Sequence, residues 1–294
     1  MDLITITAID GNAQKLDGGS MYGNAPRAVW QKWTPPDDLG RIDLSCRAML
    51  VEIGPTKILC ETGIGAFFEP KLADRYGVQT PSTHRLQQEL EAIGVPHDTI
   101  DYVILSHLHF DHAGGLFPAY QEHIKDKKKL LFPKAKYIVG IKAWERAESP
   151  HPRDQASFIP ELTEALHKSG RLLLISNAKD LSPEIRPYID FFESNGHTPG
   201  QLLTIVKGQK RKVIFTGDLI PGTPWMHIPI TMGYDRFPEM LIDEKTLLYS
   251  SLDENKDMLF FTHDTKTKAA TFKKSEKRKI VVAESWDRLH KFEI

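Results

Sequence analysis

The chain has 294 residues, 40% of them apolar, which is enough to bury a large core in one big domain or two ordinary ones. The chain has 38 Lys and Arg residues and 39 Asp and Glu residues, which gives a formal net charge of -1. This near balance argues against a nucleic-acid-binding protein. The N-terminus has no basic segment followed by a long apolar one, and no window approaches about 18 uncharged apolar residues. Neither a secretory leader nor a membrane span is therefore expected.

The two cysteines, Cys46 and Cys60, each lie within an apolar, strand-like stretch. Buried free thiols are the preferred interpretation over a disulfide. Together with the missing leader, this interpretation favours a cytoplasmic protein.

The first third of the chain is predicted to be mostly β-structure. Alternating or continuous apolar runs predict strands over 3–9, 46–54 and 56–63, with a turn at 17–19. Apolar positions with helical spacing then predict a helix over 81–94 that ends at Gly94. The short apolar run 102–106 predicts a buried strand.

The rest of the chain alternates strands and helices. Strands are predicted over 130–140, 172–176, 188–194, 201–208, 212–217 and 258–264, a closing hairpin over 269–274 and 279–285, and helices over 158–168 and 243–255. The segment 219–240 is rich in Pro, Gly and aromatic residues and is too long for a plain turn, so we interpret it as an irregular insert near the active site. Without a linker or repeat, the pattern favours one α/β domain over residues 1–294, with two packed sheets and helices outside.

A cluster of histidines directly follows the strand predicted over 102–106. In extended backbone His107 and His109 project to one side, while Leu108 and Phe110 point into the core. The small residues 113–115 then allow a turn and a close backbone approach, which would bring Asp111 and His112 near the same point. Imidazole and carboxylate groups are ligands that zinc and similar divalent ions accept.

Three more potential ligands follow strand-like runs further along the chain: His197 in SNGHTPG, Asp218 in VIFTGD and His263 in LFFTHD. Each is expected where a strand ends, the position at which functional residues commonly lie.

These motifs, in this order, resemble the metallo-β-lactamase superfamily over roughly residues 40–265. Within this superfamily, three sequence motifs are most similar to those of N-acyl homoserine lactonase-like members. They are SHLHFDHAGG, the HD pair near the C-terminal end of the match, and LDGGSMYG near the N-terminus. The resemblance implies an αββα sandwich, that is, two mixed β-sheets flanked by helices with the metals at one edge. It also implies that His107, His109 and His197 hold one metal, that Asp111, His112 and His263 hold a second, and that Asp218 bridges them.

The chain departs from the family pattern at three places. Gln201 stands where many members have a second histidine, and Glu61 stands where many have aspartate. Both could alter the groups that orient the metal ligands. The insert 219–240 differs from the known lactonases, and it leaves the substrate open.

The expected activity is hydrolysis of a small ester, with a lactone preferred, by a metal-bridging hydroxide at two divalent ions. Zinc is the expected metal, with manganese, iron and cobalt as alternatives, since nitrogen and oxygen ligands select weakly among them. Phosphodiester, phosphotriester or nucleic-acid cleavage suits the same site, and a redox di-iron or non-catalytic metal protein is a third alternative. Asp111 is also a candidate general acid.

Several other residues are candidates for contact with the substrate. Met21 and Tyr22 lie in the early Gly-Gly turn, and Trp225, His227 and Tyr234 lie in the insert, where aromatic side chains could line a pocket mouth. Tyr234 is in addition a candidate catalytic residue that would donate a hydrogen bond to the substrate carbonyl. Packing of these residues within the turn or the insert is the alternative for each.

The expected partner is a small-molecule ester or lactone, and neither nucleic acid nor a membrane is expected. A basic run between Lys266 and Lys279 is better explained as a solvated hairpin edge than as a nucleic-acid surface, because exposed lysines deter strand pairing. A homodimer through the apolar N-terminal region is an alternative to a monomer that the sequence leaves open.

Overall fold

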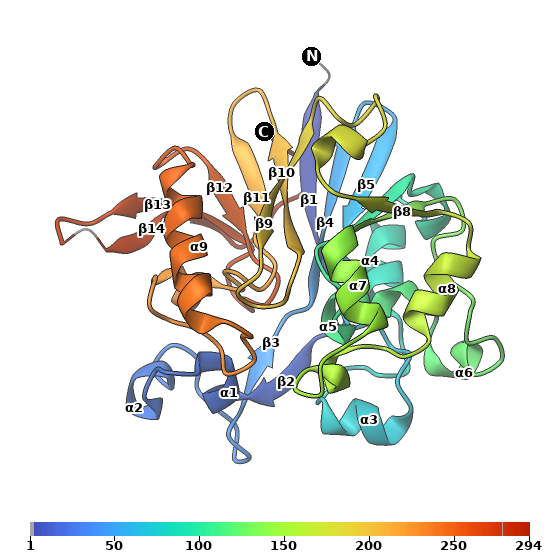
Figure 1. The fold of residues 1–294 in the computed structure, drawn as a ribbon, viewed down its shortest axis with the longest axis horizontal. Coiled ribbons are helices and arrows are strands. Elements are labelled where there is room, and N and C mark those ends of the chain that lie inside the picture. Colours follow the sequence, from blue (N-terminus) through green and yellow to red (C-terminus); the bar gives the residue numbers. More distant parts are fainter. Residues whose placement is uncertain (1–2, 278) are drawn as a thin grey trace.

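The computed structural model describes residues 3–277 and 279–294 (Figure 1). Two β-sheets pack face to face at its centre, and helices cover their outer faces. This arrangement confirms the predicted αββα sandwich. No helix within the described residues is both long and apolar enough to cross a membrane.

The first sheet has seven strands. In spatial order they are β15 (Phe292–Glu293), β1 (Ile4–Asp10), β4 (Arg47–Ile53), β5 (Thr56–Cys60), β6 (Tyr102–Leu105), β7 (Lys136–Gly140) and β8 (Leu172–Ile175). The pairs β5–β6, β6–β7 and β7–β8 are parallel and the others are antiparallel, so the sheet is mixed.

The second sheet has six strands. In spatial order they are β14 (Ile280–Trp286), β13 (Ala269–Lys274), β12 (Met258–Phe260), β11 (Lys212–Phe215), β10 (Gln201–Lys207) and β9 (Ile189–Ser194). Only β11 and β12 pair in parallel. A separate antiparallel ribbon of β2 (Gln14–Asp17) and β3 (Arg41–Leu44) lies below the two sheets in Figure 1.

The helices and helical turns fill the connections. They are α1 (Gly18–Tyr22), α2 (Arg27–Trp30), α3 (Pro70–Arg75), α4 (Arg85–Ala92), α5 (Phe110–Ala113), α6 (Tyr120–His123), α7 (Ile141–Glu148), α8 (Leu162–Lys168) and α9 (Pro238–Ser250), with 3-10 turns η1 (His97–Thr99), η2 (Gly114–Leu116), η3 (Gln155–Ser157), η4 (Ala178–Asp180) and η5 (Thr223–Met226). In Figure 1, α4, α7 and α8 lie on the side of the first sheet and α9 on the side of the second.

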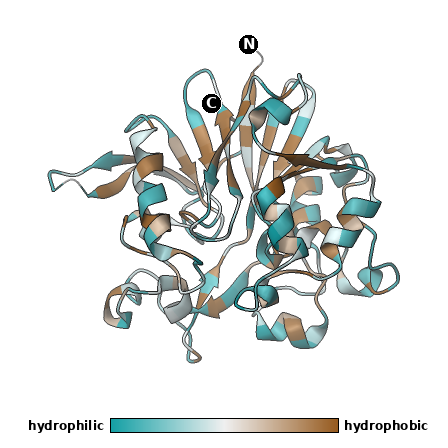
Figure 2. Ribbon diagram, viewed as in Figure 1, coloured by the Kyte–Doolittle hydropathy of each residue, from teal (hydrophilic) through white to brown (hydrophobic). Residues whose placement is uncertain are grey.

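Three buried apolar clusters correspond to the three interfaces of this sandwich. One lies between the sheets and includes Ile104 from β6 and Phe215 from β11. A second joins α4, α7 and α8 to the first sheet, and a third joins α9 and the insert to the second. Figure 2 shows the result: the central strands are apolar, whereas the helices carry polar residues on part of their surface.

Several predicted elements have other bounds in the structure, and two of these differences have a clear physical cause. The stretch predicted as a turn at 17–19 is the start of α1, whose first turn is capped by the Asp17 carboxylate accepting from Ser20 N at 2.7 Å. Helix α9 begins at Pro238, five residues before the predicted start, because proline at the first helical position has a suitable φ and needs no amide partner. Cys46 and Cys60 are buried free thiols, as predicted.

Candidate metal centre

Seven predicted ligands come from five chain segments that meet at one end of the two sheets. His107 and His109 follow β6, and Asp111 and His112 lie on the short helix α5. His197, Asp218 and His263 follow β9, β11 and β12, respectively. Because β6, β11 and β12 all present their carboxyl ends here, the segments that leave them converge (Figure 1).

The turn after His112 depends on glycines. A Cβ on Gly114 would lie 2.3 Å from Ile64 O, and one on Gly115 would lie 2.0 Å from Thr62 O. The backbone of this turn therefore packs directly against the segment after β5, which fixes α5 beneath the cluster. Leu108 and Phe110 point into the core as predicted.

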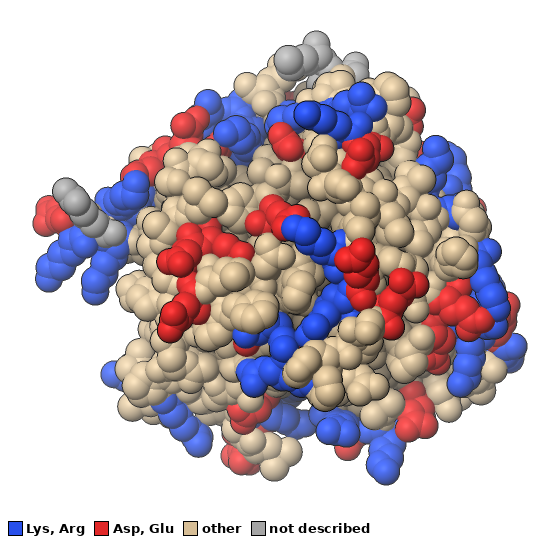
Figure 3. All heavy atoms as spheres, in the orientation of Figure 1, with Lys and Arg blue, Asp and Glu red and all other residues tan. Residues whose placement is uncertain are grey.

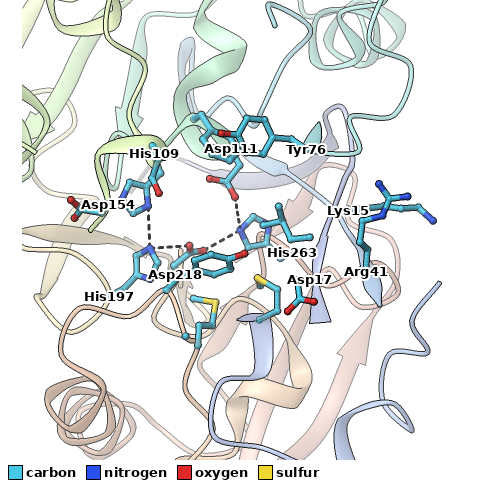
Figure 4. Close-up of a pocket in the computed structure, with 18 of the residues that line it drawn as sticks. Lys15, Asp17, Arg41, Tyr76, His109, Asp111, Asp154, His197, Asp218 and His263 are labelled. Atoms are coloured by element: carbon cyan, nitrogen blue, oxygen red, sulfur yellow. Dashed lines mark hydrogen bonds and ion pairs between the residues drawn. The ribbon is translucent and has the colours of Figure 1, made fainter. Parts of the chain in front are cut away.

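Within the described residues, three groups of potential ligand atoms are each close enough to hold a metal ion. One of them, Glu61 with His107 and His112, shares both histidines with the two sets of predicted ligands. The ligand atoms within each set lie within 4.8 Å of one another; the sets are His107, His109, His197 and Asp218, and Asp111, His112 and His263. Figure 4 shows five of these seven side chains converging on the cavity that borders them.

Asp218 lies between the two sets. Its Oδ2 is 3.2 Å from His197 Nε2, whereas its Oδ1 is 3.1 Å from His263 Nε2 and 3.3 Å from His112 Nε2. Each carboxylate oxygen thus faces a different set, the arrangement that a bridging ligand requires.

Two carboxylates fix the orientation of histidines in the cluster. The buried Glu61 accepts from His112 Nδ1 at 2.7 Å, and the buried Asp235 accepts from His197 Nδ1 at 2.9 Å. A proton held on Nδ1 leaves the Nε2 lone pair free, so both rings present Nε2 to the cluster.

In His263 and His107 the Nδ1 atom contacts an uncharged group instead of a carboxylate. His263 Nδ1 donates to Ser45 O at 2.6 Å, and His107 Nδ1 lies 2.9 Å from Ser106 Oγ. The Nε2 of His107 is buried and has no hydrogen-bond partner among the described residues. A buried nitrogen with no partner carries a desolvation cost that a bound cation would remove.

His109 is turned the other way. Its Nδ1 lies 3.2 Å from His197 Nε2. Two imidazole nitrogens at this distance either share one proton or direct lone pairs at one cation, and the His197 tautomer set by Asp235 favours the second arrangement. The donor set, its burial and its free lone pairs therefore fit divalent metal ions.

The electrostatics of the cluster are strongly coupled. Burial by itself would raise the pKa of Asp218, but His112, His197 and His263 hold it well below its usual range. Burial alone would lower the pKa values of His112 and His263, yet the neighbouring carboxylates hold both well above the usual range. Protonation of His112 and His263 would therefore compete with metal binding.

The two departures from the family pattern lie against the ligands. Glu61 contacts Ser106 as well as His112, and it adopts a positive φ of 61°. The Oε1 of Gln201 accepts from the backbone N of Asp218 at 3.3 Å. Both side chains orient ligands, and Glu61 also forms a group of potential ligands with His107 and His112.

A cavity of about 590 Å³ opens onto the cluster. His109, Asp111, His197, Asp218 and His263 form its floor (Figure 4). An open cavity that reaches two candidate metal positions is suited to a small-molecule substrate.

Two of the predicted substrate residues line this cavity and three do not. Met21 and Tyr234 are part of the lining. Tyr22 is instead fully buried, stacked on Trp225 with ring centroids 4.5 Å apart, and Trp225 Nε1 donates to Met21 O. His227 is also outside the lining. The aromatic stack explains the difference, since it holds Tyr22 and Trp225 in the core beneath the cavity wall.

The insert 219–240 is held by α9. Lys245, which is fully buried, donates to Trp225 O at 2.9 Å and to Ile230 O at 2.5 Å. Tyr249 donates to Met226 O at 3.0 Å. The insert therefore has defined partners, and its end places Asp235 against the cluster and the partly exposed Tyr234 in the cavity wall.

Two contributing residues were missed in the sequence. Asp235 has no motif around it and lies 38 positions beyond its partner His197. Gln14 Nε2 donates to Asp111 Oδ2 at 2.7 Å from the strand β2, far from any predicted ligand. Only the burial of these polar side chains, 2% and 0% exposed, distinguishes them from ordinary surface residues.

Comparison with known proteins agrees with this fold. Residues 41–129 match the family model of the metallo-beta-lactamase superfamily. The chain is a metal-dependent hydrolase, and over this segment it is similar to the metallo-β-lactamase superfamily.

The chain is also similar to curated N-acyl homoserine lactonases. It is 24% identical over 243 residues to N-acyl homoserine lactonase from Bacillus thuringiensis, a match that covers 78% of this chain and 84% of the relative.

Solved structures share the fold at low identity. A probable metal-dependent hydrolase from Staphylococcus aureus is 23% identical with a TM-score of 0.83, over 97% of this chain and 100% of that one. AidC, a dizinc quorum-quenching lactonase in complex with a product, is 19% identical with a TM-score of 0.71, over 96% and 95% of the two chains.

Proposed function

We propose that this hydrolase cleaves a small carboxylic ester, specifically a lactone, at a centre of two zinc ions. The observation that carries the proposal is the convergence of two metal-binding sets on one open cavity, with Asp218 between them. The similarity to N-acyl homoserine lactonases supports the choice of a lactone.

His107, His109 and His197 would hold one ion, and Asp111, His112 and His263 the other, with Asp218 shared. Two divalent ions in such a centre supply Lewis acidity and make a water molecule nucleophilic near neutral pH. The protein's own contribution is to hold these ligands in one geometry through Glu61, Asp235 and the other hydrogen-bond partners.

Tyr234 is the side chain best placed to act on the substrate from the opposite wall. It lines the cavity from the insert, and burial together with the carboxylates of Asp17 and Asp111 raises the pKa of its hydroxyl. The hydroxyl therefore stays protonated at neutral pH and can donate a hydrogen bond to a carbonyl oxygen as negative charge develops on it.

Asp111 has a second potential role. Gln14 holds its Oδ2, and the Asp111 side chain lines the cavity. A carboxylate in this position can pass a proton to the leaving oxygen when the ring opens.

The test is hydrolysis by zinc-loaded protein of a panel containing N-acyl homoserine lactones, simple lactones, aryl esters, a phosphodiester and a phosphotriester. We expect lactone opening that is abolished by a chelator and restored by metal. The variant His263→Asn should lose this activity, while His290→Asn, a change at an exposed histidine, should retain it. Cleavage of phosphoesters alone would overturn the ester proposal and leave the hydrolase assignment in place.

A further inference from the structure

The cavity that opens onto the metal cluster carries more basic than acidic side chains around its walls. Apart from the carboxylates of the cluster, its charged lining residues are Lys15, Arg41, Arg75, Arg153, Asp17 and Asp154. Whether these basic groups can act on a substrate depends on which of them are already neutralised.

Two of the basic residues are paired within the protein. Arg41 contacts Asp37 through Nε at 3.1 Å and Nη2 at 3.0 Å. Lys15 lies 3.3 Å from Asp43 and 3.8 Å from Asp37. In Figure 4 these two residues lie side by side, well apart from His109 and His197. This wall of the cavity is therefore close to neutral.

Asp154 does not neutralise the opposite wall. Its Oδ2 accepts from Arg146 Nε at 3.0 Å and Nη2 at 2.7 Å, and Arg236 Nε lies 3.8 Å away. The carboxylate is 7% exposed. One buried carboxylate between two guanidinium groups leaves an excess of positive charge beside His109.

Arg75 and Arg153 are the unpaired basic groups. Neither has a carboxylate within salt-bridge distance among the described residues. Arg153 Nη2 donates to Gly233 O at 2.9 Å, beside Tyr234, and the Arg75 guanidinium lies 6.0 Å from the centre of the Tyr76 ring. Both side chains are solvent-exposed, so they lie at the mouth of the cavity.

The surface view agrees with this distribution. Figure 3 shows lysine and arginine side chains in the middle of the face in view, with aspartate and glutamate side chains beside them. The basic groups free to attract an anion that enters the cavity are therefore individual residues, Arg75 and Arg153.

We propose that the preferred substrate carries an anionic group, a carboxylate or a phosphate, in addition to the ester that is cleaved, and that Arg153 and Arg75 recognise this group at the cavity mouth. This inference rests on the proposed ester hydrolysis and adds the substrate class. A guanidinium offers paired N–H donors that match the oxygens of either anion. Asp17, which is exposed and caps α1, is the opposing charge, and it lines the same stretch of surface as Arg153.

The test compares aryl esters of equal length that differ in the distal group: 4-nitrophenyl valerate, mono-4-nitrophenyl glutarate and the corresponding distal phosphonate. For zinc-loaded protein at low ionic strength we expect kcat/KM for at least one anionic ester to exceed that for the neutral ester by about tenfold. Whether the carboxylate or the phosphonate gives the larger preference identifies the anion. Equal or lower rates for both anionic esters would overturn the proposal.

Variants of Arg153 and Arg75 test whether these two residues cause the preference for anionic esters. Arg153→Gln and Arg75→Gln should each reduce the anionic-to-neutral ratio several-fold, and Arg153→Lys should retain part of it. Arg75 makes no hydrogen bond to the insert within the described residues, so its variant remains informative if Arg153→Gln disturbs the fold. Arg288→Gln, at an exposed arginine outside the cavity, is the matched control and should leave the ratio unchanged. A ratio that is unaffected by both cavity variants would overturn the assignment.

Equilibrium binding of glutarate separates this inference from the proposed function. If no ester is cleaved but glutarate binds several-fold more weakly to Arg153→Gln and Arg75→Gln than to Arg288→Gln, ester hydrolysis fails and the anion site stands. If esters are cleaved while glutarate binds equally to all three variants, the anion site fails and ester hydrolysis stands.

Discussion

The carboxylate of Asp235 accepts a hydrogen bond from His197 Nδ1 at 2.9 Å, and so joins the insert to the metal cluster. Its second oxygen accepts from the backbone N of Met232 at 2.6 Å. The insert, which the sequence suggested only as a shaper of the substrate pocket, therefore also orients a candidate metal ligand. Changes that reposition residues 232–235 should affect metal binding and catalysis together.

Replacing this carboxylate gives a first prediction. In Asp235→Asn the uncharged amide has only one oxygen, so it can no longer accept hydrogen bonds from both His197 Nδ1 and Met232 N as the two carboxylate oxygens do. His197 therefore loses its preferred tautomer. We expect the affinity for zinc to fall by about 10- to 100-fold. The measurement is metal content after dialysis against buffers of fixed free zinc concentration.

The control is Asp257→Asn, at a buried aspartate that accepts from the backbone N of Lys212 and of Asp253. This variant should lose stability and keep its zinc affinity. If both variants bind zinc as the unmodified protein does, Asp235 has no orienting role.

A second prediction concerns the hydroxyl of Tyr234. Tyr234→Phe removes one hydrogen-bond donor from the cavity and leaves the ring in place. We expect kcat for lactone opening to fall by about a hundredfold, the low end for loss of one preorganised donor. Metal content should not change, and Tyr120→Phe, on α6 outside this cavity, should keep full activity. Equal kcat values for the two variants would exclude a role for the hydroxyl.

The ligand positions could be predicted because they follow local rules. His107 and His109 alternate after a buried strand, so side-chain periodicity places them on one face. His197, Asp218 and His263 each come after a strand, and strands that end at one edge bring such residues together. The identity and order of the motifs supplied the remaining information.

The supporting residues could not be predicted in this way. Gln14 and Asp235 reach the cluster only after the chain has folded back on itself, and neither has a distinctive neighbour. The same reason explains why the sequence motif around Tyr22 wrongly predicts a substrate contact. Its burial depends on stacking against Trp225, which is more than two hundred positions away.

Lys245 gives a third prediction, about pH and stability. Burial lowers the pKa of Lys245 to about 7, although Asp235 opposes the change, whereas the ordinary lysine value is 10.5. Between these values the unfolded chain binds a proton that the folded chain does not, so this lysine makes stability rise with pH from 7 to 10.5. The contribution is about 1.4 kcal/mol per pH unit at most.

The measurement is urea unfolding of the unmodified protein and of Lys245→Met at pH 7 and pH 9.5. The difference between their free energies of unfolding should increase with pH in favour of the unmodified protein. Lys256→Met, at an exposed lysine, is the control and should show no such increase. A constant difference for Lys245→Met would show that the lysine is already neutral, or still charged, across this window.

His84 gives a fourth prediction, at acidic pH. Its Nδ1 accepts from Gln87 N at 3.2 Å and its Nε2 contacts Gly115 O at 3.0 Å, so the folded ring must be neutral. Burial lowers its pKa to about 4. As the pH falls from 6.5 to 4 the unfolded chain gains a proton first, which removes up to about 3 kcal/mol of stability. Metal-free His84→Gln should lose less stability in urea than the unmodified protein over this range, whereas His290→Gln should match it. An equal acid-induced loss in His84→Gln would mean that the ring is not held neutral, and the turn at Gly115 would then need another anchor.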